Sequence, residues 1–304
     1  MRNKRTRLVL LMLVAIALVA AGCSSDDDGA SRDGSTIVIG SANFGESALV
    51  AEIYAQALEA DGFTVERKFN VGSREIYAPA LESGELDLVP EYVGSALTYK
   101  GGTATAVTDE SARALRVLWA EDGIKVLAAA PAQDKNGFVV TAETASGLGL
   151  ATLSDLTQYS GSLVLGGPPE CPEREFCAVG LESVYGFTPS EFKPLDVGGP
   201  LTVAALTGGE IDLGLLFTTD GVILQEGFVL LEDDQGLQPA ENLIPALRQD
   251  IADEYEGAIE RVLDEVSSFL STVDLTAMNK ATGYDGEDPA EVAREWLEEK
   301  GLVG

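Results

Sequence analysis

One nine-residue segment occurs twice in the chain, and this repeat limits the folds that the sequence can adopt. Ala80–Leu88 reads ALESGELDL, and Ala205–Leu213 reads ALTGGEIDL. Each copy has the pattern of a helix end, a glycine able to take the left-handed conformation, and a short apolar strand. Two copies about 125 residues apart predict two similar α/β lobes, although so common a corner could also recur by chance.

An aromatic residue follows the aspartate of each copy by five positions, Tyr92 in the first and Phe217 in the second. Open α/β sheets bind ligands just beyond the C-terminal ends of their strands. If the lobes face each other, the two rings lie on opposite walls of a cleft. The repeat therefore predicts a ligand site between the lobes.

The N-terminal sequence predicts that the protein is located outside the cytoplasm. Four basic residues lie within residues 2–7, and Leu8–Ala21 is an uncharged apolar run, too short to span a bilayer comfortably but typical of a signal peptide. The run ends at Cys23 after small residues, which predicts a lipoprotein signal peptide over 1–22 and a lipid on Cys23. Ordinary secretion with cleavage near Gly22 is the alternative. The Ser-, Asp- and Gly-rich stretch predicts a flexible tether over 23–35, on the outer face of the cytoplasmic membrane.

Charge and composition exclude several classes of function. The chain has 50 acidic and 20 basic residues, a net charge of −30, and loss of the four basic residues with the signal peptide makes it −34. Nucleic acid is therefore not an expected partner. The chain has no histidine, which excludes histidine-based triads and the common zinc and haem sites. No paired catalytic groups are apparent, so no enzyme, metal or cofactor is expected.

The remaining cysteines lie in one short loop. Cys171 and Cys177 enclose Arg174, and an oxidising compartment favours a disulfide between them, with two free thiols as the alternative. Such a bridge would shape the loop around the arginine.

Apolar periodicity and turn residues predict alternating strands and helices. The expected strands are 36–40, 63–69, 86–89, 124–129, 137–141, 163–166, one near Phe192, 212–217 and 228–231. The expected helices are 47–60, 74–82, 91–99, 109–120, 153–158, 177–185, 200–207, 250–270 and 289–300. Such alternation predicts an α/β fold with mainly parallel sheets.

Four segments in order resemble one family. They are Ile39–Ser47 (IGSANFGES), Pro90–Ser95 (PEYVGS), Phe217–Gly221 (FTTDG) and Leu231–Asp234 (LEDD). Together they resemble the glycine betaine/choline/carnitine-type substrate-binding lipoproteins of bacterial osmoprotectant ABC importers, over residues 36–304.

The resemblance implies a type II periplasmic binding protein fold, with two α/β lobes joined by a hinge of two crossing strands. It places lobe 1 at 36–136 and 236–304 and lobe 2 at 137–235. The hinges are expected near 133–136 and 234–239. The implied partners are a small zwitterion or quaternary amine and the transmembrane subunit of an ABC permease, with the lipid anchor in the membrane. A monomer is expected. A ligand-sensing module on the same fold is the alternative.

The resemblance also implies roles for particular residues. Tyr92 stands at a tyrosine of an aromatic cage for a trimethylammonium head, and Ser95 stands at a neighbouring hydroxyl. Arg174 matches an arginine that holds the ligand's carboxylate, Asp134 matches an acidic residue beside the cage, and Phe217 stands where the family usually has tyrosine. Each has a structural alternative: packed rings for Tyr92 and Phe217, a surface ion pair for Arg174 and a solvated charge for Asp134.

The chain departs from the family pattern at three positions. Asn136 replaces a cage tyrosine, the stretch around Asn242 lacks another, and Ala42 replaces a polar residue of the first loop, beside Asn43. Each lost ring removes about 1–2 kcal/mol of cation–π stabilisation. Asn43, Asn136 and Asn242 are further candidate ligand-binding residues, and the amides of Asn136 and Asn242 favour a ligand that carries hydrogen-bond donors.

Overall fold

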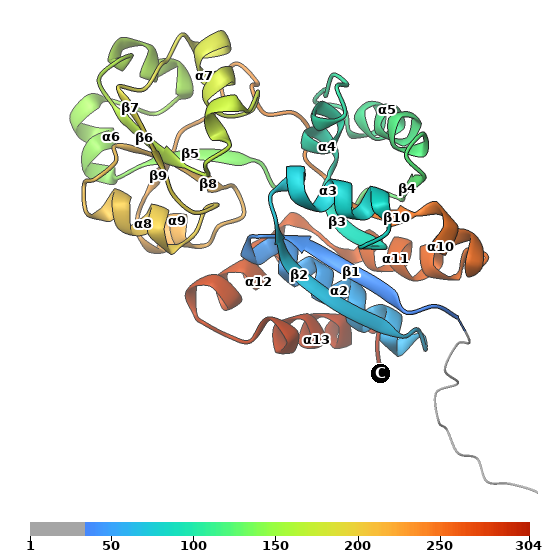
Figure 1. The fold of residues 1–304 in the computed structure, drawn as a ribbon. Helices are drawn as coiled ribbons and strands as arrows, with labels where there is room; N and C mark the ends of the chain where they lie inside the picture. The colour runs from blue at the N-terminus through green and yellow to red at the C-terminus, as the bar shows by residue number, and fades with distance from the viewer. Residues whose placement is uncertain (1–33) are drawn as a thin grey trace, which may run out of the picture. The chain divides into compact units, whose positions relative to one another are not determined.

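In a computed structural model, the structure describes residues 34–304, so the predicted signal peptide, Cys23 and most of the predicted tether lie outside the described residues. This part of the chain forms two five-stranded sheets flanked by helices (Figure 1). We use lobe 1 for the part built on the first sheet and lobe 2 for the part built on the second. No helix within residues 34–304 combines the length and apolar character needed to cross a membrane.

The sheet of lobe 1 has the strand order β2-β1-β3-β10-β4. Its strands are β1 (Ile37–Ala42), β2 (Val65–Gly72), β3 (Leu88–Tyr92), β4 (Ile124–Val126) and β10 (Leu243–Arg248). The strand β1 pairs in parallel with β2 and β3, whereas β10 runs antiparallel to β3 and β4.

The sheet of lobe 2 has the order β7-β6-β8-β5-β9. Its strands are β5 (Asn136–Val140), β6 (Val164–Gly167), β7 (Glu191–Pro194), β8 (Leu213–Phe217) and β9 (Val229–Leu230). The strand β6 pairs in parallel with β7 and β8, and β5 runs antiparallel to β8 and β9.

The expectation of mainly parallel sheets holds for four of the five strands in each sheet, and one reversed strand makes each sheet mixed. The strand β10, which the sequence did not predict, begins at Leu243 opposite Tyr92, the last residue of β3. The strand β5 begins at Asn136 opposite Phe217, the last residue of β8. Each of these strands enters its sheet at the end where the neighbouring strand finishes, so it must run in the opposite direction.

Helices cover both faces of the first sheet. One face packs on α2 (Gly45–Ala60), α11 (Ala258–Phe269), α12 (Thr272–Asn279) and α13 (Pro289–Lys300). The other packs on α3 (Arg74–Ser83), α4 (Val93–Tyr99) and α5 (Thr108–Ala120). The short α10 (Gln249–Glu254) follows β10, and a π-helical turn, η3 (Lys280–Tyr284), links α12 to α13.

The second sheet is covered in the same way. The helices α6 (Ala142–Leu148) and α7 (Ala178–Tyr185) pack on one face with the 3₁₀ turns η1 (Leu153–Tyr159) and η2 (Cys171–Glu173). The helices α8 (Pro200–Thr207) and α9 (Val222–Gln225) pack on the other face.

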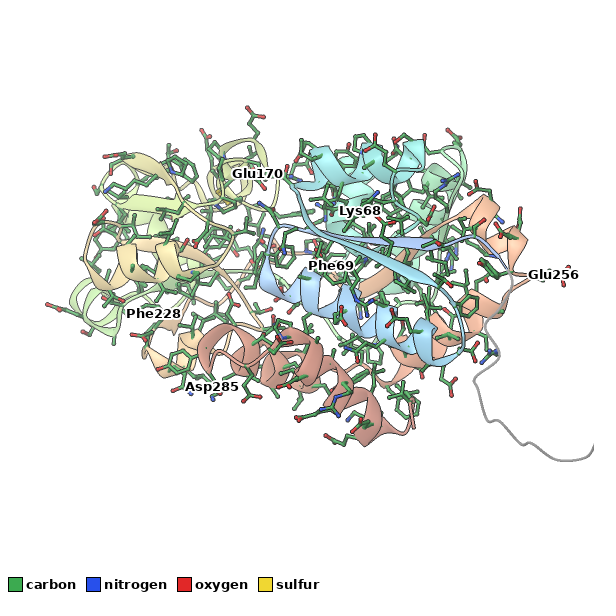
Figure 2. The ribbon with its side chains drawn as sticks, turned by 60° about the horizontal axis from the view of Figure 1, so that its bottom comes forward. Lys68, Phe69, Glu170, Phe228, Glu256 and Asp285 are labelled. Atoms are coloured by element: carbon green, nitrogen blue, oxygen red, sulfur yellow. A yellow bond between two sulfur atoms is a disulfide. The ribbon has the colours of Figure 1, made fainter. Side chains whose placement is uncertain are left out.

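Two of the predicted helices differ from the structure for an identifiable physical reason. The expected helix over 250–270 is two helices, because Glu256 (φ 49°) and Gly257 (φ 85°) take left-handed conformations between α10 and α11; Figure 2 labels Glu256 at this turn. The expected helix over 91–99 begins only at Val93, since Glu91 and Tyr92 pair with β10 as the end of β3.

The repeated segment builds the same corner in both lobes. Gly84 ends α3 with φ 84°, and Gly209 lies just after α8 with φ 69°. The backbone N–H that follows each glycine, at Glu85 and Glu210, donates to the carbonyl of the first repeat residue at 2.9 and 2.8 Å. The repeat is therefore a structural motif of both lobes, as the sequence predicted.

The two chain crossings between the lobes lie side by side. Gln133 and Asn242 form an antiparallel bridge, and the Asp134 N–H donates to the Glu241 carbonyl at 3.1 Å. The second crossing thus meets the first a few residues beyond the range 234–239 named from the sequence. The lobe boundaries 36–136 with 236–304, and 137–235, stay a prediction.

Candidate ligand-binding cleft

A cavity of about 340 Å³ lies between the lobes, beyond the ends of β1, β3 and β8. Residues of both lobes line it, and Glu170, labelled in Figure 2, belongs to the lobe 2 side of its wall. The position follows the rule that α/β sheets present ligand sites at their strand C-termini. Seven of the eight candidate ligand-binding residues line this cavity, Asn242 being the exception.

Three aromatic rings meet in the cavity. The ring of Phe44 lies 5.0 Å from that of Phe217 and 6.0 Å from that of Tyr92, centroid to centroid. Both pairs are tilted, by 35° and 34°. The rings of Tyr92 and Phe217 thus flank a third ring, which sequence reasoning missed.

Phe44 could have been found from its position in the chain. It is an apolar residue between the end of β1 and the start of α2, within the segment that carried the family resemblance. A bulge helps to shape this loop: Asn70 takes φ 57°, and its backbone N–H donates to Ser41 Oγ at 2.8 Å. Phe44 therefore adds a third ring to the wall of the cavity.

A buried ion pair supports Tyr92 from the lobe 1 side. Arg74 donates to both oxygens of Glu91 at 2.9 and 2.8 Å, and Tyr77 Oη donates to the same carboxylate at 2.7 Å. The other Glu91 oxygen accepts the Tyr92 backbone N–H at 2.9 Å. Burial lowers the pKa of Arg74, but the charge of Glu91, its hydrogen bond and the neighbouring Tyr77 together hold this pKa well above its usual range. Arg74 also lines the cavity, and the sequence did not predict it as a site residue.

A buried carboxylate lies behind the tyrosine. Glu46 accepts a hydrogen bond from Tyr92 Oη at 2.5 Å, from Thr219 Oγ1 at 2.6 Å and from the Asn279 amide. Its side chain comes from the first turn of α2, and Glu46 is 5% exposed. Burial raises the pKa of Glu46, and burial together with the Glu46 charge raises the pKa of Tyr92.

Asp134 lies at the chain crossing and lines the cavity. Its Oδ1 accepts hydrogen bonds from the Thr219 N–H and from Thr218 Oγ1, both at 3.1 Å, whereas its buried Oδ2 has no hydrogen-bond partner. Burial, and then the negative charges of Glu46 and Asp220, raise the pKa of Asp134. An unpaired acceptor in the wall of a cavity is suited to a hydrogen-bond donor or a cation on a ligand.

A further carboxylate engages Ser95. The Ser95 hydroxyl donates to Glu241 at 2.6 Å, and the backbone N–H groups of Gly94 and Ser95 donate to the other oxygen at 3.1 Å. Burial raises the pKa of Glu241 to about 7. Ser95 lines the cavity as predicted, but its hydroxyl is already engaged by this acid.

Arg174 reaches across the cleft. Cys171 and Cys177 form a disulfide that closes its loop, and the Arg174 guanidinium contacts both oxygens of Glu75 on α3, at 2.7 and 2.9 Å. Its partner is thus a residue of the opposite lobe and not Glu173 or Glu175 beside it. Both contacts come from Nη2 of the guanidinium, so a ligand carboxylate at Arg174 would either share the guanidinium with Glu75 or replace it.

The three candidate asparagines have different places. Asn43 lines the cavity. Asn136 also lines it, and its amide donates to the Phe176 carbonyl at 2.9 Å. The Asn242 amide donates to the Ala130 carbonyl at 2.8 Å, so that side chain ties the chain crossing together outside the cavity wall. The structure therefore does not bring Asn242 to the cavity wall with the other candidates, and its part in ligand binding stays a prediction.

Comparisons with known proteins agree with this architecture. Residues 35–299 match the family described as the substrate binding domain of ABC-type glycine betaine transport system. The glycine betaine-binding protein YehZ of Escherichia coli is 27% identical over 97% of this chain and 96% of its own length. The carnitine transport binding protein OpuCC of Listeria monocytogenes is 26% identical over 98% and 97%. A crystal structure of a glycine betaine/carnitine/choline ABC transporter protein shares the fold, with a TM-score of 0.69 and 22% identity over 88% of this chain and 98% of its own.

Proposed function

Because this chain belongs to the family of substrate-binding domains of ABC-type glycine betaine transport systems, we propose that it captures a small cationic or zwitterionic solute outside the cytoplasm and delivers it to an ABC permease. The family match confirms the resemblance drawn from the sequence, and the fold is that of a type II periplasmic binding protein. The proposed ligand is a glycine betaine- or choline-like osmoprotectant. No enzymatic step is part of the proposal.

The aromatic cluster in the cavity carries the proposal. A quaternary ammonium group has no N–H to donate, so the faces of aromatic rings are its natural hosts. Phe44, Tyr92 and Phe217 supply three rings from both lobes within 6.0 Å of a neighbour, centroid to centroid. The carboxyl groups of Asp134 and Glu46 lie in and behind the same wall and add negative potential.

The two ends of a zwitterionic ligand would meet different walls. Its cationic head would lie among the rings, and its carboxylate would take the place of Glu75 on Arg174. A planar guanidinium suits a carboxylate because it can donate two parallel hydrogen bonds. Ligand contacts with both lobes would then favour the closed form that a permease recognises.

A second candidate ligand is a non-quaternary solute that carries hydrogen-bond donors. The unpartnered Asp134 Oδ2 and Thr98 Oγ1, both in residues that line the cavity, favour it. Such a ligand would use the same cleft and the same delivery step. Anchoring through a lipid on Cys23 is part of the proposal for either ligand.

Thermal unfolding of the purified protein against a panel of solutes tests the proposal. The panel contains choline, glycine betaine, carnitine, ergothioneine, proline and arginine, each at several concentrations. A ligand at 100 times its dissociation constant stabilises by about 2.7 kcal/mol, which is several degrees in melting temperature. A rise with a quaternary amine supports the first candidate, and a rise only with proline or arginine supports the second. No shift with any of the six contradicts the proposed function.

A further inference from the structure

Three carboxyl groups gather around one threonine below the cavity, and we call Glu46, Asp134 and Asp220 the acid cluster. Thr219, which is 0% exposed, donates its hydroxyl to Glu46 at 2.6 Å and its backbone N–H to Asp134 at 3.1 Å. Asp220 is the next residue and accepts the Phe217 backbone N–H at 2.8 Å. Glu46 and Asp134 are 5% and 4% exposed.

No cation pairs with the acid cluster in the part of the chain that the structure describes. Lys135 follows Asp134 in the chain, and Lys280 lies against Gly221, next to Asp220, but pairs with Asp285. The donors to Glu46 are the neutral groups of Tyr92, Thr219 and Asn279, and the donors to Asp134 are those of Thr218 and Thr219. Among residues 34–304, no lysine or arginine forms an ion pair with any member of the cluster. The titratable groups that face Glu46 are Tyr92, Asp134 and Asp220.

Uncompensated carboxylates at such close quarters do not all ionise. Burial favours the neutral form of each group, and each anion raises the pKa of its neighbours. Burial raises the pKa of Glu46, and burial together with the charges of Glu46 and Asp220 raises the pKa of Asp134. Burial also raises the pKa of Asp220 to about 7. With the cavity empty, the cluster therefore retains a proton near neutral pH.

The cavity gives a ligand's positive charge a route to the cluster. Asp134 lines the wall, and its carboxyl group interacts with that of Glu46, while its buried Oδ2 accepts no hydrogen bond from a neutral donor. Tyr92 presents its ring to the cavity and its hydroxyl to Glu46. A cation held among the rings would thus be in electrostatic contact with two members of the cluster.

We propose that the acid cluster exchanges its proton for a cationic ligand. When the cation enters, an O–H bond of a cluster carboxylic acid breaks, the carboxylate stays to neutralise the ligand, and the proton passes to the solvent. The charge buried at the site is then the same before and after binding. This inference rests on the proposed function, because it needs a ligand with a positive charge.

Proton release makes ligand affinity depend on pH. The affinity of a permanent cation rises as pH rises toward the pKa of the cluster and levels off above it, with a limit of tenfold per pH unit for one proton. Choline is the suitable probe because its ammonium group does not titrate, so any proton released comes from the protein.

Calorimetric titration of the full-length protein with choline, in phosphate and in Tris at pH 6.5, measures the released proton directly. The two buffers differ in their heat of protonation, so the difference in binding heat gives the number of protons released. We expect a value between zero and one for the unmodified protein, and an affinity that increases between pH 5 and pH 7.

A matched pair of variants assigns the proton to the cluster. Glu46→Gln keeps the shape of the side chain, which does not line the cavity. We expect this variant to release close to zero protons on binding choline. Its affinity for choline should then vary by no more than about twofold between pH 5 and pH 7. Glu52→Gln changes a second buried glutamate of α2, one that is already paired with Arg67 at 2.7 Å, and it should release the proton as before. Asp220→Asn serves as a second cluster variant in case Glu46→Gln does not fold.

The outcomes separate this inference from the proposed function. Equal binding heats in the two buffers, with choline bound, overturn proton exchange and leave the binding function standing. Unchanged proton release in Glu46→Gln and Asp220→Asn also overturns it. A protein that binds none of the six solutes of the panel contradicts both, because no cation then enters the cavity.

Discussion

The two lobes hold their cavity rings in the same way but with different electrostatics. Asp87 and Asp212 each exchange a pair of hydrogen bonds with the neighbouring strand: Asp87 at 2.7 and 2.8 Å with Val38, and Asp212 at 3.0 and 2.9 Å with Val164. Five residues later, the backbone N–H of each ring residue donates to a carboxylate. That carboxylate is Glu91 for Tyr92 and Asp220 for Phe217.

The difference lies in what neutralises the two carboxylates. Glu91 is 0% exposed and paired with Arg74, whereas Asp220 has no cationic partner among the described residues. Burial consequently raises the pKa of Asp220 to about 7. The comparison teaches that repeated backbone geometry fixes where the rings stand, while the side chains around it decide which wall responds to pH.

Glu91→Gln should have the largest effect on stability. The substitution leaves the Arg74 guanidinium buried without a counter-charge, and breaking one side of a buried ion pair costs about 3–5 kcal/mol. Urea unfolding at pH 7 measures the loss. The control is Asp220→Asn, which retains an acceptor for the Phe217 N–H and removes a carboxyl group that resists ionisation, so it should not lower the free energy of unfolding. Similar losses in both variants would show that the two walls are equivalent after all.

The pH dependence of stability should distinguish the walls next. The folded state keeps protons on Asp220 and Glu241 up to about pH 7, whereas the unfolded chain releases them near pH 4. In this window the folded state binds more protons, so the free energy of unfolding falls as pH rises from about 4 to about 7, by at most about 1.4 kcal/mol per unit and proton.

Urea unfolding of the ligand-free protein across this range tests the direction. Asp220→Asn should flatten the slope, because it removes one of the titrating groups. The control Glu52→Gln changes a glutamate that is paired with Arg67. It should leave the dependence of unfolding free energy on pH unchanged. Stability that rises over the same interval would contradict the assignment of raised pKa values to these acids.

Loss of the ring of Tyr92 or of Phe217 should weaken the binding of a quaternary amine. The expected change in free energy is smaller than the changes in stability predicted above. Tyr92→Leu and Phe217→Leu each remove one ring face, worth about 1–2 kcal/mol or roughly 5- to 30-fold in dissociation constant. Tyr92→Leu should be the more damaging, since it also removes a donor to Glu46. Calorimetry with choline measures the effect.

The neutral analogue 3,3-dimethylbutan-1-ol provides the control for the ring variants. It has the shape of choline without the charge, so it should bind weakly and lose little further affinity in either variant. Equal losses for choline and the analogue would mean that the rings act only by apolar packing.

Much of the fold could be predicted because it depends on local signals. The repeat, with Gly84 and Gly209 at the helix ends, identified two equivalent corners, and the five-residue spacing placed Tyr92 and Phe217 in one cavity. The α8 limits, 200–207, were predicted to the residue. The strand β10 was missed because Pro245 interrupts its apolar run, a residue that this strand accommodates between β3 and β4.

The buried charges could not be predicted, since they depend on contacts between distant segments. Glu46 meets Thr219 across 173 positions, and Ser95 meets Glu241 across 146. A single glutamate in the first turn of a helix is typical of an exposed residue that interacts with the helix dipole. Nothing in the sequence around Glu46 marks it as the acid behind a cavity tyrosine.

The ion pair between the lobes should give the smallest effect and the sharpest test of ligand class. Glu75 and Arg174 have side chains 49% and 26% exposed, so their pairing is worth about 0–1 kcal/mol. Glu75→Gln removes a carboxylate that competes with a ligand carboxylate for Arg174. The affinity for glycine betaine should therefore rise by up to about fivefold, while the affinity for choline, which has no carboxylate, should not change. Glu173→Gln, in the same loop as Arg174 and on the cavity wall, is the matched control and should leave the ratio of the two affinities as it was. A parallel gain for both ligands would instead mean that Glu75 acts on cleft closure, and that Arg174 does not read the ligand's carboxylate.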